Sequence, residues 1–498
     1  MMLKKVSFFI LLLLVAYKLK SQESDSNQLP ETFHSISSHD ILGYAKKLSS
    51  PEFKGRLSGS PEFMQAANWV ATQFEEWDVS AMGDNETYFQ SFDNPYTEVY
   101  TSGSVMYFYK DENGKQVVNN YHFPEEYFPG QNSGSGTIES DLIYVGYGIS
   151  APELGYDDYA GVDVKGKIIV MESGLPVGRN NPEIEKWVPY DYHQYKFKNA
   201  VEHGAIGWLY INKLANPNTS YHKEIVYAHI GEEVATDIFK ASGKDYKQIK
   251  ENINKNLETN SFVLKGKAKI AAETKRYEDA KSCNVIGFIE GFDPELKNEV
   301  IIVGAHLDGV GSPGKLLPGA LDNASGVVNV MAAAKALAQS EVKPGRSIMF
   351  ILFGGEECGL VGSTYYVNHP KVQKENVIGM INLDMVGNGT GLALWGGASF
   401  PEITKHFIHA NDKYIHRSMR TSEAHPVTTR PRTDGAVFTM NGYKSFSVGT
   451  TNRIKPVYYH HPLDNVDALT PEIMEDAAKL LYLGLLGIAI DEDLLEDR

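Results

Sequence analysis

The spacing of apolar residues changes along the chain and predicts three regions of different structure. Between Ala66 and Phe74, apolar side chains recur every three to four residues, as on the buried face of a helix. Residues 40–79 therefore predict two helices joined by a polar loop, and residues 84–128 predict strands and turns. From about 136 to 272 the chain shows short β-rich runs such as "GKIIVMES", separated by Gly, Pro and Asp. These runs predict a small, separate β-rich module.

From Asn284 onward, apolar strands alternate regularly with helices. The strand patterns include "EVIIVGAHLD", "RSIMFILFGGEE" and "VIGMINLDMVG". The last helix has Thr470 placed as its N-cap and Pro471 at its first position. Near-continuous apolar strands that alternate with helices predict an α/β domain whose sheet is covered on both faces.

The N-terminus carries the pattern of a secretory signal. Lys4 and Lys5 precede an apolar run over residues 6–16, and the small residue Ser21 follows. We expect residues 1–21 to be a signal peptide and the protein to be exported to the periplasm or the extracellular space. Two lysines close to the cleavage site leave retention as an uncleaved anchor open. No later run reaches the roughly 18 apolar residues of a membrane span, so we expect no integral membrane segment in the mature chain.

Composition narrows the class of protein. The chain has 498 residues, enough for two or three domains, and its 42% hydrophobic content is that of a globular protein. A formal net charge of −16 argues against nucleic acid or an anionic membrane as a partner. The only two cysteines, Cys283 and Cys358, exclude a disulfide scaffold and a thiolate zinc site. Whether these two thiols pair with each other stays open.

Side chains of metal-binding type follow most of the strands in the α/β region. In open α/β sheets, binding sites form outside the carboxyl ends of the strands. A single carboxylate or histidine there is usually a turn or hydrogen-bonding residue. Here, however, five loops at the same predicted edge of the sheet each carry at least one carboxylate or histidine. Histidines and carboxylates without cysteine suit Zn²⁺. The candidates are His306, Asp308, Asp322, Glu356, Glu357, Asp384, His460 and His461.

Two absences exclude other common hydrolase designs. The sequence contains no HExxH helix, which argues against the other frequent zinc-peptidase site. It also contains no GxSxG nucleophile elbow.

Five motifs in this region resemble a known family. "GAHLDGVG", "GALDNASGV", "FGGEECGLVGS", "NLDMVG" and "YYHHPLDN" match, in order and spacing, the family-28 metallopeptidases, the co-catalytic di-zinc aminopeptidases. "SSPEFKGRLSGSPEFMQAANWVATQFEEW" is similar to the N-terminal helices of that family. "YDDYAGVDVKGKIIV" and "KNAVEHGAIG" resemble the protease-associated domain often inserted in it. The resemblance covers nearly the whole mature chain.

The resemblance implies a fold and a division into domains. The fold is a mixed, mostly parallel sheet covered by helices on both faces, of the zinc-exopeptidase type, with an inserted β-rich protease-associated domain. After the signal peptide, residues 34–128 would form the N-terminal part of the peptidase domain. Residues 129–275 would form the inserted domain, and residues 276–498 the main part of the peptidase domain.

The resemblance also implies roles for the candidate ligands. One zinc would be held by His306 and Asp384, the other by Glu357 and His460, and Asp322 would bridge both. Glu356, beside the metals but not bound to them, would be the general base for a zinc-bridging water. Ligation by His461 in place of His460 is the alternative.

Four further residues are expected near the metals or in the substrate pocket. Asp308 and Asp464 would each orient a ligand imidazole; the alternative is that both are turn aspartates. Asp434 in "TTRPRTDGAVF" matches a family motif near the substrate pocket. Arg432, or its neighbour Arg430, would meet a substrate carboxylate or backbone carbonyl; a solvated arginine pair is the alternative.

Together these features predict an exported di-zinc exopeptidase, an aminopeptidase that releases N-terminal residues from peptides. One alternative is a carboxypeptidase or dipeptidase, since related enzymes on this fold accept different chain ends. Glutaminyl cyclisation, which similar folds perform with one zinc, is a second alternative, although the complete five-ligand set argues against it. A non-enzymatic binding module that uses the protease-associated domain is a third, although no expected ligand or base is missing.

Overall fold

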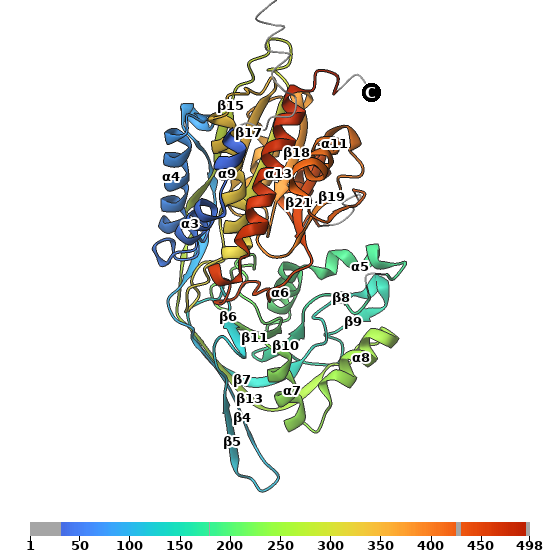
Figure 1. Ribbon diagram of the computed structural model, residues 1–498. Helices are drawn as coiled ribbons and strands as arrows, with labels where there is room; N and C mark the ends of the chain where they lie inside the picture. Colours follow the sequence, from blue (N-terminus) through green and yellow to red (C-terminus); the bar gives the residue numbers. More distant parts are fainter. Residues whose placement is uncertain (1–30, 179, 425–429, 495–498) are drawn as a thin grey trace, which may run out of the picture.

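The computed structural model describes residues 31–178, 180–424 and 430–494, and these contain two large β-sheets (Figure 1). The first is a nine-stranded sheet in the order β1-β15-β17-β16-β18-β21-β19-β20, with β2 also paired to β15. Its strands are β1 (Ser80–Ala81), β2 (Phe89–Asp93), β15 (Lys281–Ile289), β16 (Val300–His306), β17 (Ser347–Phe353), β18 (Val377–Leu383), β19 (Gly391–Trp395), β20 (Met419–Thr421) and β21 (Ser445–Thr451).

The centre of this sheet is parallel and buried on both faces. Strands β17, β16, β18 and β21 run parallel in that spatial order, whereas β15 and β19 join the outer strands of this group in antiparallel register. Every residue of β16 and β17 is buried, which explains their continuous apolar sequences. The mixed, mostly parallel sheet predicted from the sequence is confirmed.

Helices cover the two faces in a way that creates a switch point at β16. The helix α9 (Ser325–Ala338), which leads from β16 to β17, packs on one face, and α10 (Val361–Asn368), which leads from β17 to β18, packs on the other. The next strand in the chain, β17, therefore pairs with one edge of β16, and the strand after it, β18, pairs with the other edge. In open α/β sheets with such an arrangement, ligands bind at the carboxyl ends of the central strands.

The remaining helices of this part complete both layers. The predicted N-terminal helices are present, and they pack in the same core as α9 and the C-terminal helix. Ser60 caps α4, its Oγ accepting the backbone N–H of Phe63 at 3.1 Å. These helices are α2 (Glu31–Ser35), α3 (Ser38–Leu48), α4 (Pro61–Glu76), α11 (Pro401–Ala410), α12 (Asp434–Met440) and α13 (Pro471–Ile490).

The second sheet has eight strands in the order β5-β4-β13-β7-β10-β11-β12-β6 and two hydrophobic cores of its own. Its strands are β4 (Ser104–Lys110), β5 (Gln116–Asn120), β6 (Tyr127–Pro129), β7 (Gly136–Tyr144), β10 (Ile168–Glu172), β11 (Gly207–Ile211), β12 (Val226–Ile230) and β13 (Phe262–Ala272). Its helices are α5 (Ile184–Asp191), α6 (His193–Glu202), α7 (Glu232–Ala241) and α8 (Tyr246–Asn256). We call residues 104–272 the insert.

The insert begins earlier than the sequence predicts. The expected boundary at residue 129 assigned β4, β5 and most of β6 to the peptidase domain, but all three strands belong to the second sheet. The reason is a long-range pairing: β4 lies antiparallel to β13, with Met106 opposite Lys269. The alternation of apolar and polar residues along β4 predicts a strand, but it does not indicate which strand pairs with it. Two ribbons complete the strands, β3 (Tyr96–Val99) with β14 (Thr274–Tyr277), and β8 (Ser150–Ala151) with β9 (Tyr156–Asp157).

The expected signal peptide at residues 1–21 lies outside the described ranges, and two further sequence expectations can be compared with them. Both cysteines within them, Cys283 and Cys358, are free thiols. None of the helices in these ranges combines the length and apolarity needed to cross a bilayer.

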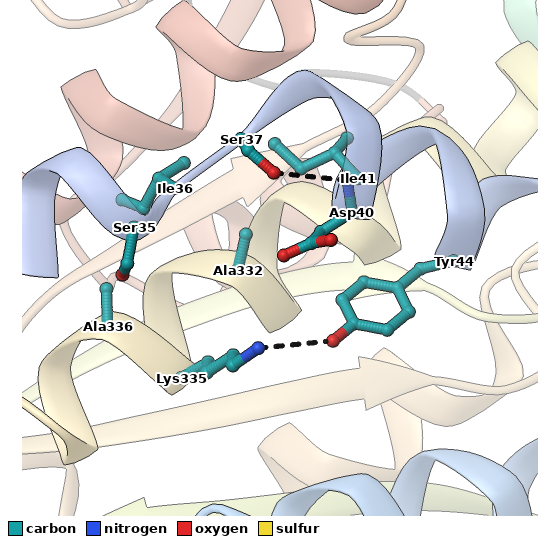
Figure 2. Close-up of a pocket in the computed structure, with 9 residues that line it drawn as sticks. All are labelled: Ser35, Ile36, Ser37, Asp40, Ile41, Tyr44, Ala332, Lys335 and Ala336. Atoms are coloured by element: carbon teal, nitrogen blue, oxygen red, sulfur yellow. Dashed lines mark hydrogen bonds between the residues drawn. The ribbon is translucent and has the colours of Figure 1, made fainter.

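A small pocket lies between α3 and α9, where Tyr44 and Lys335 approach each other (Figure 2). Its volume of about 20 Å³ has room for roughly one water molecule. None of its lining residues is a candidate ligand.

Candidate metal centre

The carboxyl ends of the central strands bring the predicted ligands together. His306 is the last residue of β16, Glu356 and Glu357 follow β17, and Asp384 follows β18. Asp322 lies in a short turn, η4 (Ala320–Ala324), immediately before α9, and its own backbone angles are not helical. His460 comes from the long loop after β21.

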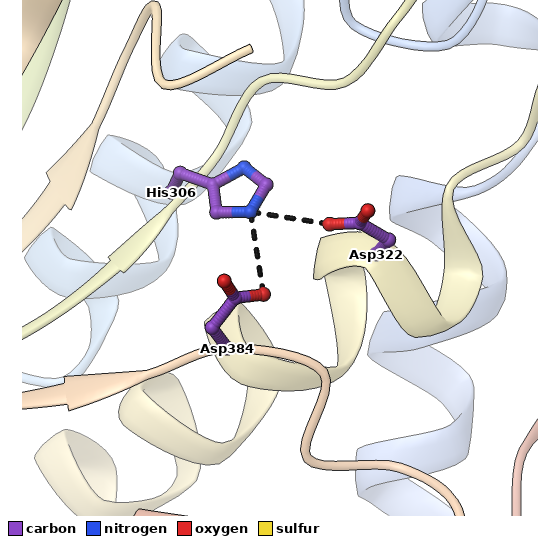
Figure 3. A group of neighbouring side chains, drawn as sticks. All are labelled: His306, Asp322 and Asp384. Atoms are coloured by element: carbon purple, nitrogen blue, oxygen red, sulfur yellow. Dashed lines mark ion pairs between the residues drawn. The ribbon is translucent and has the colours of Figure 1, made fainter. Parts of the chain in front are cut away.

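His306 lies between two carboxylates (Figure 3). Its Nε2 is 3.2 Å from Oδ1 of Asp322 and 3.5 Å from Oδ1 of Asp384. Its Nδ1 is 3.2 Å from the backbone carbonyl oxygen of Asp308. A carbonyl oxygen only accepts, so Nδ1 carries the proton and Nε2 is the atom presented to the carboxylates.

His460 repeats this arrangement on the other side of Asp322. Its Nε2 is 2.9 Å from Oε2 of Glu357 and 3.6 Å from Oδ2 of Asp322. Its Nδ1 is 2.7 Å from the backbone carbonyl oxygen of Ala215. Asp322 therefore offers one carboxylate oxygen to each imidazole.

Three groups of side chains in the described ranges could each hold a metal ion, with ligand atoms within 4.8 Å of one another. They are His306 with Asp322 and Asp384, Asp322 with Glu357 and His460, and His306 with Glu356 and Glu357. The first two groups share only Asp322. They contain all five predicted ligands and leave Glu356 out.

The electrostatics of the cluster fit a bound cation. Burial, together with the charges of Glu357 and Asp434, holds the pKa of Glu356 well above its usual range, although the His306 charge opposes this. Burial disfavours a charged His306, but hydrogen bonds to Asp322 and Asp384 outweigh it and hold the imidazole pKa well above 6.5. Oδ1 of Asp384 is buried and faces Nε2 of His306 at 3.5 Å. Buried carboxylates that face imidazole Nε2 atoms form an N and O donor set suited to a divalent cation such as zinc.

Asp308 and Asp464 act differently from the expectation that each orients an imidazole. The carboxylate of Asp308 is 3.8 Å from Nδ1 of His306, farther than its own backbone oxygen. It instead accepts the backbone N–H groups of Glu356 at 3.1 Å and Glu357 at 3.2 Å. This carboxylate therefore fixes the backbone of the two adjacent glutamates, Glu356 and Glu357, which we call the glutamate doublet.

The carboxylate of Asp464 does not orient His460, whose Nδ1 faces Ala215. Its Oδ1 accepts the backbone N–H of Leu321 at 2.8 Å, and its Oδ2 accepts that of Asp322 at 3.1 Å. The expectation was wrong because the loop from His460 to Asp464 turns the aspartate toward η4. Asp464 therefore holds the residue shared by the two groups.

The other predicted residues belong to none of the three groups. His461 stacks on Tyr458 and belongs to none of the three groups. Asp434, at the start of α12, is buried, and this burial raises its pKa to about 6. Arg432 is 70% exposed and lies 3.6 Å from the carboxylate of Asp191 in the insert, which favours the solvated alternative for this arginine.

Arg56 was not among the predicted site residues. Its guanidinium is fully buried and donates to the backbone oxygens of Leu307, Pro318 and Gly319 at 2.8–2.9 Å, and to that of Leu48 at 2.6 Å. It thereby joins the loop after β16 to the turn that carries Asp322. Burial lowers its pKa to about 10, against the charges of Asp308 and Asp464, so the side chain is a cation at neutral pH. The signal was an arginine inside the polar stretch "FKGRLSG".

Tyr459 was also missed. Its ring stacks on His460 at a centroid distance of 3.8 Å. The residue is 50% exposed, but partial desolvation of its hydroxyl and the charges of Glu357 and Asp322 raise the pKa of that hydroxyl, which places it in the field of the carboxylates. Its position directly before His460 in "YYHH" was the available signal.

Comparisons with known proteins show similarity to peptidases. Residues 284–483 match the model of peptidase family M28. The chain is 29% identical over 371 residues to aminopeptidase YwaD of Bacillus subtilis, covering 70% of this chain and 68% of that protein. It is 38% identical over 110 residues to leupeptin-inactivating enzyme 1 of Streptomyces exfoliatus, covering 22% and 24% of the two chains.

Solved structures show the same fold. The zinc aminopeptidase BSAP from Bacillus subtilis superposes with a TM-score of 0.61 at 20% identity, covering 92% of this chain and 96% of that one. An aminopeptidase from Aneurinibacillus sp. strain AM-1 gives 0.59 at 20% identity, covering 91% and 94%. The match to peptidase family M28 over residues 284–483, together with the site, identifies this part of the chain as a metallopeptidase domain.

Proposed function

We propose that this protein is an exported aminopeptidase that uses two zinc ions per chain. The observation that carries the proposal is the pair of side-chain groups that share only Asp322. In each group an imidazole has its Nδ1 occupied by a backbone carbonyl and its Nε2 directed at carboxylates. Relatives and structural neighbours named as aminopeptidases, one of them as a zinc enzyme, support the choice of metal and reaction.

Five side chains would hold the zinc ions. His306 and Asp384 would bind one ion, Glu357 and His460 the other, and Asp322 both. Bound zinc supplies Lewis-acid chemistry toward a carbonyl group and toward water.

Glu356 is assigned as the general base. Its backbone N–H is fixed by Asp308, and its side chain is partly exposed, whereas Glu357 is buried. An Oε atom of Glu356 would take a proton from the attacking water and later give it to the leaving amine of the peptide. Asp308, which holds both glutamates through their backbones, would keep this carboxylate in place.

Two further parts of the proposal concern the rest of the chain. The insert is proposed to be a protease-associated domain, on the resemblance of "YDDYAGVDVKGKIIV" and "KNAVEHGAIG". Export to the periplasm or the extracellular space rests on the signal pattern of residues 1–21.

Metal content and substrate choice test the proposal together. Carefully dialysed protein should contain two zinc ions per chain by elemental analysis. It should release N-terminal residues from peptides with a free α-amine and leave N-blocked peptides intact. One ion per chain would contradict the two-metal site, and release of C-terminal residues from N-blocked peptides would make the protein a carboxypeptidase.

A further inference from the structure

One loop of the insert reaches the candidate metal centre. This loop, residues 213–219, lies between β11 and β12, and we call it the bridge segment. Its residue Ala215 is fully buried in a small cluster with Phe128, Val310 and Leu317, which come from both parts of the protein. The backbone oxygen of Ala215 is the hydrogen-bond acceptor for Nδ1 of His460 at 2.7 Å.

The bridge segment also touches the loop that carries the glutamate doublet. Asn218 packs against Gly359, which is two residues after Glu357. A Cβ atom added to Gly359 would lie only 2.7 Å from the side-chain amide of Asn218. With its amide nitrogen facing this loop, Asn218 donates to the backbone oxygen of Cys358 at 3.2 Å. The bridge segment therefore contacts two of the three loops that supply the second group of ligands, those of His460 and Glu357.

The rest of the insert fixes the bridge segment in place. Nδ2 of Asn132 donates to the backbone oxygens of Pro217 at 2.7 Å and Thr219 at 2.6 Å. Oδ1 of Asn132 accepts hydrogen bonds from Thr97 at 2.8 Å and Arg276 at 3.2 Å. Asn132 is buried, so water does not compete for these hydrogen bonds, and they hold the bridge segment in place.

We propose that the bridge segment is a working part of the metal centre, with Ala215 and Asn218 as positioning residues. The carbonyl of Ala215 keeps the proton on Nδ1 of His460 and directs the free electron pair of Nε2 toward Glu357 and Asp322. Asn218 supports the loop of Glu357. The affinity for the zinc at His460 and Glu357 consequently depends on the insert. This inference rests on the proposed two-zinc function.

The imidazole at the other proposed zinc is oriented locally. Nδ1 of His306 faces the backbone oxygen of Asp308, two residues later in the chain, and not the bridge segment. Loosening the bridge segment should therefore weaken the binding of the zinc at His460 and Glu357 and leave the affinity for the other zinc unchanged.

Two variants of the full-length protein test this dependence. Asn132→Asp keeps the size of the side chain and its acceptor oxygen but removes both hydrogen bonds donated to the bridge segment. Asn218→Ala removes the side chain over Gly359. Asn120, exposed at the end of β5 in the β4–β5 hairpin that extends away from the nine-stranded sheet (Figure 1), provides the matched controls Asn120→Asp and Asn120→Ala.

Zinc affinity is measured by competition with a chromophoric chelator. We expect one of the two zinc ions to bind on the order of 10–100-fold more weakly in Asn132→Asp, the usual effect of losing support for a metal ligand. A smaller loss is expected in Asn218→Ala and none in the controls. In Co²⁺-loaded protein, the visible absorption should change for one ion only.

A double-mutant cycle separates positioning of His460 from a general loss of structure. In a His460→Ala background, Asn132→Asp should cause little further loss of zinc affinity. An equal loss in that background, or wild-type affinity for both ions in both variants, would overturn the inference. If Asn132→Asp does not fold, the partly exposed Asn218 carries the test. Wild-type protein without two zinc ions would instead refute the proposed function.

Discussion

Nε2 of His460 lies 2.9 Å from Oε2 of Glu357, a residue 103 positions earlier in the chain. This contact separates the two adjacent glutamates, because Glu357 joins the group of His460 and Asp322, whereas Glu356 does not. Adjacent residues with different partners can carry different roles, one as a metal ligand and the other as a base.

Replacing Glu356 by Gln tests the assigned base. The substitution keeps the shape and removes the proton acceptor, so both zinc ions should remain while kcat falls by roughly 10²–10⁴-fold. KM should change less, because a proton acceptor acts mainly in the transition state. Steady-state kinetics and elemental analysis on the same preparation check both statements.

Replacing Glu357 by Ala should have a different effect. One zinc ion should bind more weakly, the melting temperature should fall, and activity should partly return at high zinc concentration. Loss of metal in Glu356→Gln with both ions retained in Glu357→Ala would reverse the two roles. Near-native turnover in either variant would place the site elsewhere.

Arg56→Lys should destabilise the protein and weaken zinc binding together. Lysine cannot donate to all four backbone oxygens that Arg56 contacts. Each buried acceptor left without a partner costs about 1–3 kcal/mol, so the free energy of unfolding should fall by roughly 2–4 kcal/mol. Denaturant titration measures this loss, and chelator competition measures zinc affinity.

The exposed Arg420 on β20 offers a matched control for that substitution. Arg420→Lys should leave both measurements unchanged. If Arg56→Lys behaved like this control, Arg56 would not support the ligand loops.

Asp464→Asn tests how the shared ligand is held. The carboxylate accepts the N–H groups of Leu321 and Asp322 with separate oxygens, and an amide can replace only one of them. Zinc affinity should fall on the order of 10-fold or more. The exposed Asp467, changed in the same way, should show no loss. Equal affinities in the two variants would contradict a role for Asp464 in placing Asp322.

His229 should make the insert sensitive to acid. It is fully buried on β12, its Nδ1 donates to the backbone oxygen of Asn212 at 3.0 Å, and burial lowers its pKa to about 4. Between pH 4 and the unfolded value near 6.5, the unfolded chain binds a proton that the folded chain does not, so stability falls as pH decreases. The loss attributable to His229 should reach at most about 3 kcal/mol.

His229→Asn keeps a donor for Asn212 and removes the ionisation, so the fall in stability between pH 6.5 and 4 should become shallower. His122→Asn, at an exposed position, is the control. Unfolding by denaturant at several pH values gives the slopes. Parallel curves for His229→Asn and wild type would show that His229 does not titrate in this range.

The sequence by itself determined the large sheet and the candidate ligands at its edge. The strands over residues 281–289, 300–306, 347–353 and 377–383 were readable because burial on both faces requires continuous apolar runs. His306, Asp322, Glu357 and Asp384 were readable because each lies at the end of such a strand or in the segment that follows it. These signals come from residues that are neighbours in the chain, so a single sequence is enough to show them.

Only the tertiary structure decided how these side chains are held. Ala215 and His460 are 245 residues apart, and the backbone oxygen that orients the imidazole leaves no trace in residue type. The same holds for Asp464, which supports η4 in place of a histidine, and for Arg56, whose acceptors are backbone carbonyls. The β4–β5 hairpin likewise joined the insert through its pairing with β13. Long-range contacts through the backbone depend on where the chain passes in space, and periodicity and residue type do not encode that path.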